Sequence, residues 1–247
     1  MSSPKRIGTI RVLRRYPVKS MAGEDLDRVF VSYAGLVGDR AYAFVDNRNK
    51  TNFPWMTGRQ GHEMILYQPR YVHPPEVNDL RPEAERFRAE VVSPEGEKFN
   101  VGEAKLQKHL EDRFGRSLKL RFSERAMTDA RPVSLFGRAT VQTLSSETGM
   151  TLDYRRFRAN FYVDWESGEP FFENSLVGKT VQIGDEVTVH VVERDARCAM
   201  ITLDPETAKA SPEVHRNVVQ KHEGCAGVYG AVLREGIVQV NDPVYAV

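Results

Sequence analysis

Short apolar runs, separated by turns rich in Gly, Pro and Asp, make up most of the chain. Such runs are typical of β-strands, whose side chains alternate between two faces. The turn from Ser93 to Gly96 predicts a tight hairpin, because its proline and glycine adopt the dihedral angles that such turns need. The predicted strands cover residues 7–13, 26–31, 41–45, 64–68, 87–91, 99–101, 161–163, 180–183, 186–192, 227–233 and 237–240.

Two segments have the signals of an amphipathic helix. Residues 103–114 carry two leucines four positions apart, and Gly115 is a predicted C-terminal stop. The second helix is predicted to begin at Ser211, an N-cap residue followed by proline, and to end near Gly224. Many strands and few helices predict a mostly β protein, a β-rich α+β fold with a barrel-like core, rather than a doubly wound α/β sheet.

The chain has 247 residues, a length that suits one large domain or two small ones. A boundary is predicted near residues 95–118, at the first helix, which gives domains 1–100 and 101–247. The proline-rich stretch 69–82 is predicted to be a long surface loop.

Composition excludes several classes of protein. Lys and Arg total 35 against 34 Asp and Glu, so the net charge of +1 argues against a basic nucleic-acid-binding protein. No apolar stretch approaches the length of a membrane span, and no apolar signal segment begins the chain. The two cysteines, Cys198 and Cys225, exclude a disulfide framework and a cluster held by four thiolates, and they favour a reducing cytoplasm.

The chain carries no nucleotide-binding glycine loop, no G-x-S-x-G elbow and no H-E-x-x-H zinc motif. The segment around Cys198 is the best chemical candidate, because neighbouring arginines would stabilise a thiolate that acts as a nucleophile or as a ligand of a soft metal. A small buried residue that fills a β core explains Cys198 equally well at this stage, since free cysteines are among the most buried residues.

Three further segments carry groups suited to anions. Lys19 and Ser20 follow the first predicted strand, and an ammonium with a hydroxyl binds oxyanions. The turn 57–60 contains Arg59, and residues 155–160 carry three arginines before a strand. A solvated lysine and an exposed charged turn are the favoured explanations of the Lys19 segment and of residues 155–160 when each is taken alone.

Taken together, the order and spacing of these segments resemble the MOSC family, named for the C-terminal domain of molybdenum-cofactor sulfurases. Residues 5–95 are similar to the family's N-terminal β-barrel domain, with Tyr-Pro-Val-Lys-Ser at 16–20 and Gly-Leu-Val-Gly-Asp-Arg at 35–40. Residues 115–247 are similar to the MOSC domain. The hallmark cysteine motif and the closing strand of that domain match Arg197, Cys198, Thr202, Asp204, Pro205, Thr207 and residues 240–245. The resemblance implies a MOSC β-barrel preceded by a smaller β-barrel-like domain.

The layout is similar to that of the amidoxime-reducing enzymes of mitochondria and their bacterial counterparts, which carry a molybdenum pterin and reduce N-hydroxylated compounds. The resemblance implies molybdopterin-bound molybdenum as the cofactor and Cys198 as its thiolate ligand and catalytic residue. It implies that the cofactor's anionic and pterin groups are held by Lys19, Ser20, Arg59, Arg158, Asn160, Arg197, Thr202 and Ser145, the last flanked by Thr143 and Ser146 in a strand-to-turn segment. Asp195 and Asp204 are near enough in sequence to support the metal site, and no proton donor is assigned.

The sequence also differs from those relatives. Ala208 follows Thr207 where the family commonly has glycine, so the loop after Asp204 is expected to differ if that glycine adopts a left-handed conformation. The anchoring segment of the mitochondrial forms and the ferredoxin-like domain of some bacterial forms have no counterpart here. Cys225 is predicted to be a core residue at the start of a strand.

The resemblance therefore implies a small-molecule substrate and a separate electron donor, such as a ferredoxin, a cytochrome b5-like protein or a flavin reductase, with no nucleic-acid or membrane partner. The leading hypothesis is a cytoplasmic molybdenum-cofactor oxidoreductase that reduces N-hydroxylated substrates by oxygen-atom transfer. A second hypothesis is a sulfurtransferase that carries a persulfide on Cys198. A third is a non-catalytic module that binds an anionic ligand or nucleic acid through residues 155–158.

Overall fold

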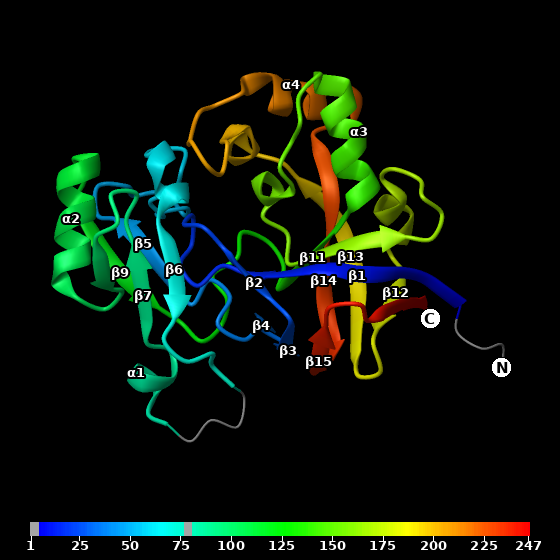
Figure 1. Ribbon diagram of the computed structural model, residues 1–247, viewed down its shortest axis with the longest axis horizontal. Coiled ribbons are helices and arrows are strands. Elements are labelled where there is room, and N and C mark those ends of the chain that lie inside the picture. The colour runs from blue at the N-terminus through cyan, green and yellow to red at the C-terminus, as the bar shows by residue number, and fades with distance from the viewer. Residues whose placement is uncertain (1–4, 77–80) are drawn as a thin grey trace.

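A closed barrel forms the larger part of the molecule (Figure 1), which is described by a computed structural model over residues 5–76 and 81–247. Its sheet runs in the order β11-β10-β14-β13-β12-β16-β1-β2, and a further pairing of β1 with β11 closes seven of these strands. The mostly β fold predicted from the sequence is confirmed. The strands of the sheet are β1 (Lys5–Arg15), β2 (Glu24–Leu26), β10 (Val133–Gly137), β11 (Phe161–Trp165), β12 (Thr180–Ile183), β13 (Val187–Ala196), β14 (Cys225–Arg234) and β16 (Pro243–Ala246).

The barrel interior is filled by aliphatic side chains, because alternate residues of each strand point inward. Ile10 and Leu13 of β1 are fully buried there, together with Val189 and Val191 of β13. β1 pairs with β16 on one side and with β11 on the other. A strand from the start of the chain therefore completes a barrel built mainly from residues beyond 132.

A second core lies outside the barrel and draws on residues 18–118. Leu106 and Leu110 are fully buried in it, and Gly115 ends their helix with a φ of +60°, as the sequence pattern predicts. The elements around this core are β5 (Tyr42–Asp46), β6 (Gln68–Tyr71), β7 (Ala89–Val92), β8 (Lys98–Asn100), β9 (Leu118–Phe122), α1 (Glu83–Arg86), α2 (Ala104–Phe114) and the 3₁₀ helix η1 (His62–Leu66).

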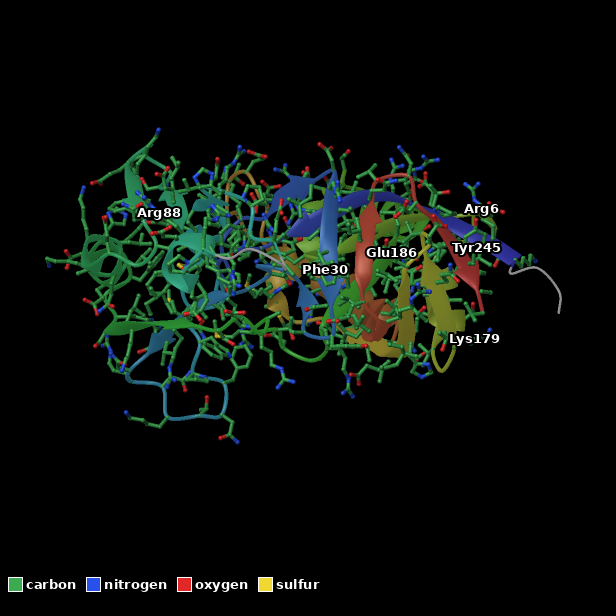
Figure 2. The ribbon with its side chains drawn as sticks, turned by 90° about the horizontal axis from the view of Figure 1, so that it is seen from below. Arg6, Phe30, Arg88, Lys179, Glu186 and Tyr245 are labelled. Carbon is green, nitrogen blue, oxygen red and sulfur yellow. The ribbon has the colours of Figure 1, made fainter. Side chains whose placement is uncertain are left out.

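A small sheet connects the two parts. It contains β3 (Arg28–Ser32), β4 (Gly35–Leu36) and β15 (Gly236–Gln239), in the order β15-β3-β4. Seen from below, Phe30 of β3 lies between Arg88 on the side of the second core and Glu186 on the barrel (Figure 2). Residues from both ends of the chain thus meet between the two cores.

Helices cover one end of the barrel (Figure 1) and enclose a third core around Phe136, Leu144 and Val214. They are α3 (Arg138–Thr148), α4 (Pro212–Lys221) and the 3₁₀ helices η2 (Tyr154–Phe157), η3 (Phe172–Leu176) and η4 (Ala199–Thr202). In the described part of the chain no helix has the length and apolarity needed to cross a membrane.

Several local predictions were wrong. The predicted strand 64–68 is mostly the 3₁₀ helix η1, because a short buried apolar run fits a helix as well as a strand. The predicted strand 26–31 is split between β2 and β3. The predicted loop 69–82 begins inside β6, and residues 77–80 lie outside the described residues. The segment with Thr143, Ser145 and Ser146 is the helix α3, not a strand-to-turn, since its apolar residues are spaced for burial on one helical face.

The ladder between β13 and β14 is irregular where it approaches the helices. Its register shifts between Val191 and Glu193 and again between Arg194 and Ala196. Gly227 lies opposite the second shift with a φ of +78°, and a Cβ atom there would lie 2.7 Å from Phe136 and 3.0 Å from Arg197 Nη2. Bulges of this kind bend a strand and redirect its side chains. The bulge and Gly227 together set the direction of residues 195–198.

We predict that Gly227→Ala lowers the free energy of unfolding by about 2–5 kcal/mol. The loss arises because alanine is strained in the left-handed backbone conformation and because its Cβ would collide with Phe136 and Arg197. Gly224→Ala is the matched control, because Gly224 also has a positive φ (+74°) but has open space where its Cβ would lie. The control loses only about 1–2 kcal/mol. Urea denaturation measures both losses, and equal losses would contradict the packing argument.

Candidate functional site

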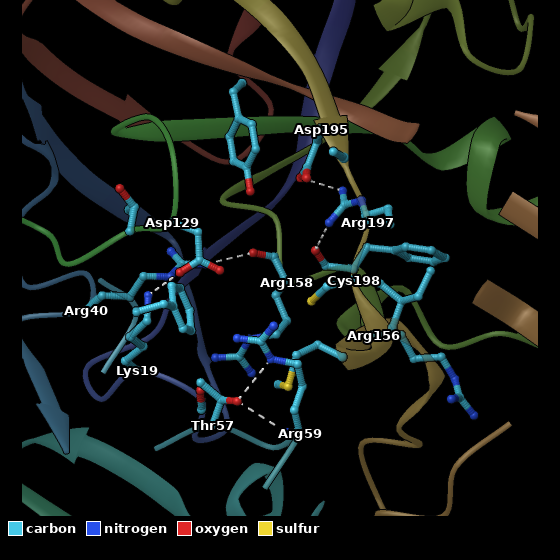
Figure 3. A pocket seen from close by; sticks show the side chains of 18 of the residues that line it. Lys19, Arg40, Thr57, Arg59, Asp129, Arg156, Arg158, Asp195, Arg197 and Cys198 are labelled. Atoms are coloured by element: carbon cyan, nitrogen blue, oxygen red, sulfur yellow. Dashed lines mark hydrogen bonds and ion pairs between the residues drawn. The ribbon is translucent and has the colours of Figure 1, made fainter. Parts of the chain in front are cut away.

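A pocket of about 480 Å³ lies where the barrel and the N-terminal part meet (Figure 3). It contains seven of the residues singled out in the sequence: Lys19, Ser20, Arg59, Arg158, Asn160, Arg197 and Cys198. Thr202 and Ser145, the other two, are not among its lining residues. A second cleft, of about 700 Å³, shares Arg156, Arg158 and Met200 with the pocket but does not include Cys198. The thiol therefore marks the smaller cavity as the chemical site.

Cys198 is exposed, so the explanation of this residue as core filling is wrong. The loop that carries Cys198 lies between β13 and η4, and side chains from other parts of the chain hydrogen-bond to it. Arg156 donates to Thr202 O at 2.7 Å and to an Asp204 carboxylate oxygen at 2.8 Å. His215 Nε2 lies 2.9 Å from Arg197 O. These contacts fix the loop while the thiol remains accessible from the pocket.

Lys19 is almost fully buried at the pocket wall. Its ammonium group donates to Met127 O at 2.7 Å and to a carboxylate oxygen of Asp129. Burial lowers the pKa of Lys19, the nearby Arg40 and Arg158 guanidinium groups act in the same direction, and Asp129 opposes them. Three cations, Lys19, Arg40 and Arg158, therefore share this wall with two paired carboxylates, Asp129 and Asp39.

Arg158 is the least compensated of these cations. Its guanidinium lies over the Tyr16 ring, 4.4 Å from the centroid, and its buried Nη2 has no hydrogen-bond partner. No carboxylate of the described residues forms an ion pair with it. Burial lowers the pKa of Arg158 to about 10. Such a group lowers the stability of the folded chain until an anion reaches it.

Arg59 reaches the pocket from the turn 57–60. Its guanidinium lies 4.7 Å from the centroid of the Phe53 ring, and its Nε is 3.4 Å from Thr57 Oγ1. The turn packs closely against the cysteine loop, because a Cβ on Gly58 would lie 2.8 Å from Met200 Sδ. This packing places an exposed arginine in the same pocket as Cys198.

Asn160 and Arg197 line the pocket, but their polar atoms are used within the protein. Asn160 donates to Arg14 O and to a carboxylate oxygen of Asp39, and it accepts from Ser134. The Arg197 guanidinium donates to Ala226 O at 2.6 Å and to Phe157 O at 2.8 Å. It also pairs with Asp195 at 2.8 Å. We interpret both residues as scaffold that orients the pocket.

Sequence reasoning missed several pocket residues, among them Arg40, Asp129 and Tyr229, whereas Asp195, suggested as support for the metal site, does line the pocket. Arg40 belongs to the matched segment 35–40, which was a usable signal, and it donates to Arg158 O at 3.0 Å. Asp129 lies in an irregular stretch without any motif. Three of the seven non-glycine residues with positive φ among the described residues, Ser20, Arg40 and Arg158, line this pocket. Such backbone strain persists where the surroundings fix it, often at functional sites.

Other predicted residues have structural roles. Thr202 donates to Ala199 O at 2.7 Å, and Ser145 donates to Val141 O within α3 at 2.8 Å. Ala208 has a φ of +56°, so the loop keeps the left-handed conformation with alanine in place of glycine. Cys225 is partly buried at the first position of β14.

The arginines of residues 155–158 do not form an exposed basic cluster. Arg155 pairs with Asp153 and Glu206, and Arg156 pairs with Asp204. Phe157 and Arg156 are buried. Arg158, the third arginine, is unpaired but lies in the pocket wall, so this segment does not present a row of exposed cations of the kind that binds a nucleic-acid backbone.

Removing the unpaired charge should stabilise the empty protein. Burial holds the folded-state pKa of Arg158 below its unfolded value, so its charge disfavours folding at neutral pH, and this effect diminishes only above about pH 10. Arg158→Met should raise the free energy of unfolding of cofactor-free protein by about 1 kcal/mol. This is a net value, because the variant also loses the favourable contact between the guanidinium and the Tyr16 ring.

Asn160→Leu is the matched control in the same pocket wall. It removes the side-chain amide that donates to Arg14 O and Asp39 and accepts from Ser134, and it should cost about 2–4 kcal/mol. Thermal unfolding of protein made in a host that lacks molybdopterin compares the two variants. A loss of stability in Arg158→Met as large as that in Asn160→Leu would contradict the distinction between ligand-binding and scaffold residues.

Comparison with known proteins agrees with this architecture. A model of the MOSC N-terminal beta barrel domain matches residues 7–114, and a model of the MOSC domain matches residues 122–245. A sequence comparison with curated proteins finds no match.

Among solved structures, the YuaD protein of Bacillus subtilis is 14% identical, with a TM-score of 0.51 over 98% of this chain and 97% of that one. YiiM from Geobacillus stearothermophilus is 17% identical, with a TM-score of 0.37 over 47% of this chain and 54% of that one. YiiM from Escherichia coli is 15% identical, with a TM-score of 0.35 over the same shares. The likeness to YuaD supports the fold alone. Because the two family models follow each other in the expected order and together cover most of its length, the chain belongs to the MOSC family.

Proposed function

We propose that this protein binds a molybdenum–molybdopterin cofactor in the pocket of Cys198 and reduces N-hydroxylated compounds with electrons from a separate donor. One observation carries the proposal: an exposed thiol and a buried guanidinium without an anionic partner share one pocket. A thiolate is a soft ligand, and a guanidinium binds phosphate in a fixed geometry. Together they suit a ligand that has a soft metal at one end and a phosphate at the other.

The remaining lining residues fit the same ligand. In the described chain no group of three or more His, Cys, Asp and Glu side chains could hold a bare metal ion, so a single thiolate suits a metal that brings its own sulfur ligands. Lys19, Arg59 and the Ser20 hydroxyl complement the phosphate and the polar pterin edge. The aromatic ring of Phe53 offers a flat surface beside Arg59.

When bound, the cofactor would supply the two-electron redox chemistry that reduces the N–OH group. The residues of this chain would bind the cofactor and orient it in the pocket. Cys198 would ligate the metal, and Arg158 and Lys19 would neutralise the phosphate. Arg156 and His215 hold the loop that carries the thiol.

The electron donor is a further part of the proposal. The two cysteines of this chain cannot ligate an iron–sulfur cluster of the four-thiolate kind, so a ferredoxin, a cytochrome b5-like protein or a flavin reductase would deliver the electrons. The exposed side of the pocket gives such a donor and a small substrate access to the same centre.

Metal analysis tests this function directly. We predict stoichiometric molybdenum and pterin in protein purified from a host that makes the cofactor, and loss of most of the molybdenum in Cys198→Ser. Cys225→Ser is the matched control, because that thiol is partly buried and is not among the pocket's lining residues. Wild-type protein without molybdenum or pterin, or equal metal content in both variants, would refute the proposal.

A second function is favoured by the exposure of Cys198 alone. An accessible thiol flanked by arginines can accept a sulfur atom from a cysteine desulfurase and carry it as a persulfide. In this case, incubation with a desulfurase and free cysteine should add the mass of one sulfur atom to the wild type and to Cys225→Ser, but not to Cys198→Ser. An unchanged mass in all three proteins excludes the sulfur carrier.

A further inference from the structure

Asp195 is directed into the pocket by the bulge near the end of β13. The register shift between Arg194 and Ala196 brackets this residue, and Gly227 lies opposite it on β14. Asp195 is 3% exposed and lines the pocket together with Cys198. In Figure 3 Asp195 and Cys198 belong to the same stretch of chain, with the Arg197 guanidinium between them. A carboxyl group is thus fixed close to the thiol and away from bulk water.

The surroundings of Asp195 come from four parts of the chain. Arg197 Nη2 lies 2.8 Å from its carboxylate, and the Tyr229 hydroxyl on β14 favours the charged form of the carboxylate. The positive charge of Arg40 favours the ionised form of Asp195, and the negative charge of Asp129 disfavours it. Burial outweighs these effects and raises the pKa of Asp195 to about 6.

Arg197 does not depend on Asp195 alone. Its guanidinium keeps the carbonyl oxygens of Ala226 and Phe157 as partners when the carboxyl is protonated. The site therefore tolerates both protonation states of Asp195, which is a requirement for a group that gives and regains a proton.

The second carboxylate, the arginines and Tyr229 are poorer proton donors, and the Lys19 ammonium already donates to Met127 O and Asp129. Asp129 is the second carboxylate among the described lining residues, but its side chain is 53% exposed and is paired with Lys19. None of the described lining residues is histidine. The arginines keep their protons at neutral pH, and burial next to Asp195 raises the pKa of Tyr229 far above neutrality.

We propose that Asp195 is the proton donor of this pocket, with Tyr229 as the residue that holds its carboxyl group in position. This proposal rests on the proposed function. The overall change is R–NH–OH + 2 e⁻ + 2 H⁺ → R–NH₂ + H₂O, in which the N–O bond breaks, nitrogen is reduced and the external donor protein is oxidised. Asp195 gives one proton to the departing oxygen, and the second proton reaches the nitrogen from solvent. The Asp195 carboxylate regains a proton from solvent before the next turnover.

The test compares Asp195→Asn with Asp164→Asn in cofactor-loaded protein. Asparagine keeps the size of the side chain and an acceptor for Arg197 but has no proton to give. Asp164 is a half-exposed carboxylate on β11, paired with Arg11 and Arg138 outside the pocket. Reduced methyl viologen supplies the electrons, since its oxidation involves no proton, and benzamidoxime is the N-hydroxylated probe.

We expect Asp195→Asn to lower kcat by a factor of about 100, with molybdenum and pterin content unchanged, because a positioned acid contributes roughly 100- to 10,000-fold. In the wild type kcat should fall as the pH rises above about 6, since the donor must be protonated. Asp195→Asn should lose this pH dependence, and Asp164→Asn should retain the wild-type rate and profile.

Tyr229→Phe gives a signature that a purely structural role would not produce. The hydroxyl lowers the pKa of Asp195, so its removal should shift the descending limb of the pH profile to higher pH while the metal content stays constant. In cofactor-free protein, carbon NMR of labelled aspartate should show a carboxyl group that titrates near pH 6, is absent from Asp195→Asn and moves upward in Tyr229→Phe.

The outcomes separate this proposal from the function on which it rests. A loaded wild-type protein that does not reduce benzamidoxime overturns the proposed function. An active wild type accompanied by an Asp195→Asn variant that retains more than one third of the rate, or the same pH profile, overturns the role of Asp195. An Asp195 carboxyl group that titrates near pH 4 in the cofactor-free protein overturns it as well.

Discussion

The pocket holds more positive charge than its own carboxylates balance, and much of the surrounding structure serves to maintain that imbalance. Arg158 lies under the pocket with Nη2 unpaired, in a left-handed backbone conformation that few residues adopt. A free arginine would turn to water or to a carboxylate. Here the Asp39 carboxylate forms an ion pair with Arg40 and accepts a hydrogen bond from Asn160, and Arg40 donates a hydrogen bond to Arg158 O. The scaffold thus keeps its carboxylates away from Arg158, which stays free to bind an anionic ligand.

The fold explains how residues distant in sequence form this arrangement. β1 closes the barrel and delivers Lys19 and Ser20 just beyond its end, while β13 delivers Cys198 from the opposite part of the chain. The turn 57–60 belongs to the N-terminal part yet packs against Met200 of the cysteine loop. Each part contributes cations, and the MOSC part contributes the thiol. The pocket therefore exists only when both parts of the chain are folded against each other.

The sequence predicted the strands with clear alternation, the helix α2 with its Gly115 stop, and the MOSC resemblance that the family models confirm. It could not separate ligand-binding from scaffold residues. Asn160 and Arg158 stand two positions apart in one motif, but only the contacts made through β1 and β10 show that Asn160 has no free polar atom. Asp129 and Tyr229 carry no local pattern, because tertiary packing alone brings them to the pocket. The helical period of α3 was missed, which misplaced Ser145.

The central claim is that Cys198 is a ligand of molybdenum held by the cations of this pocket. X-ray absorption at the molybdenum edge of the purified protein measures the sulfur neighbours of the metal directly. If Cys198 is a ligand, the residual metal of Cys198→Ser has one fewer sulfur neighbour than the metal of the wild type, and Cys225→Ser is unchanged. An identical sulfur shell in wild type and Cys198→Ser would contradict it.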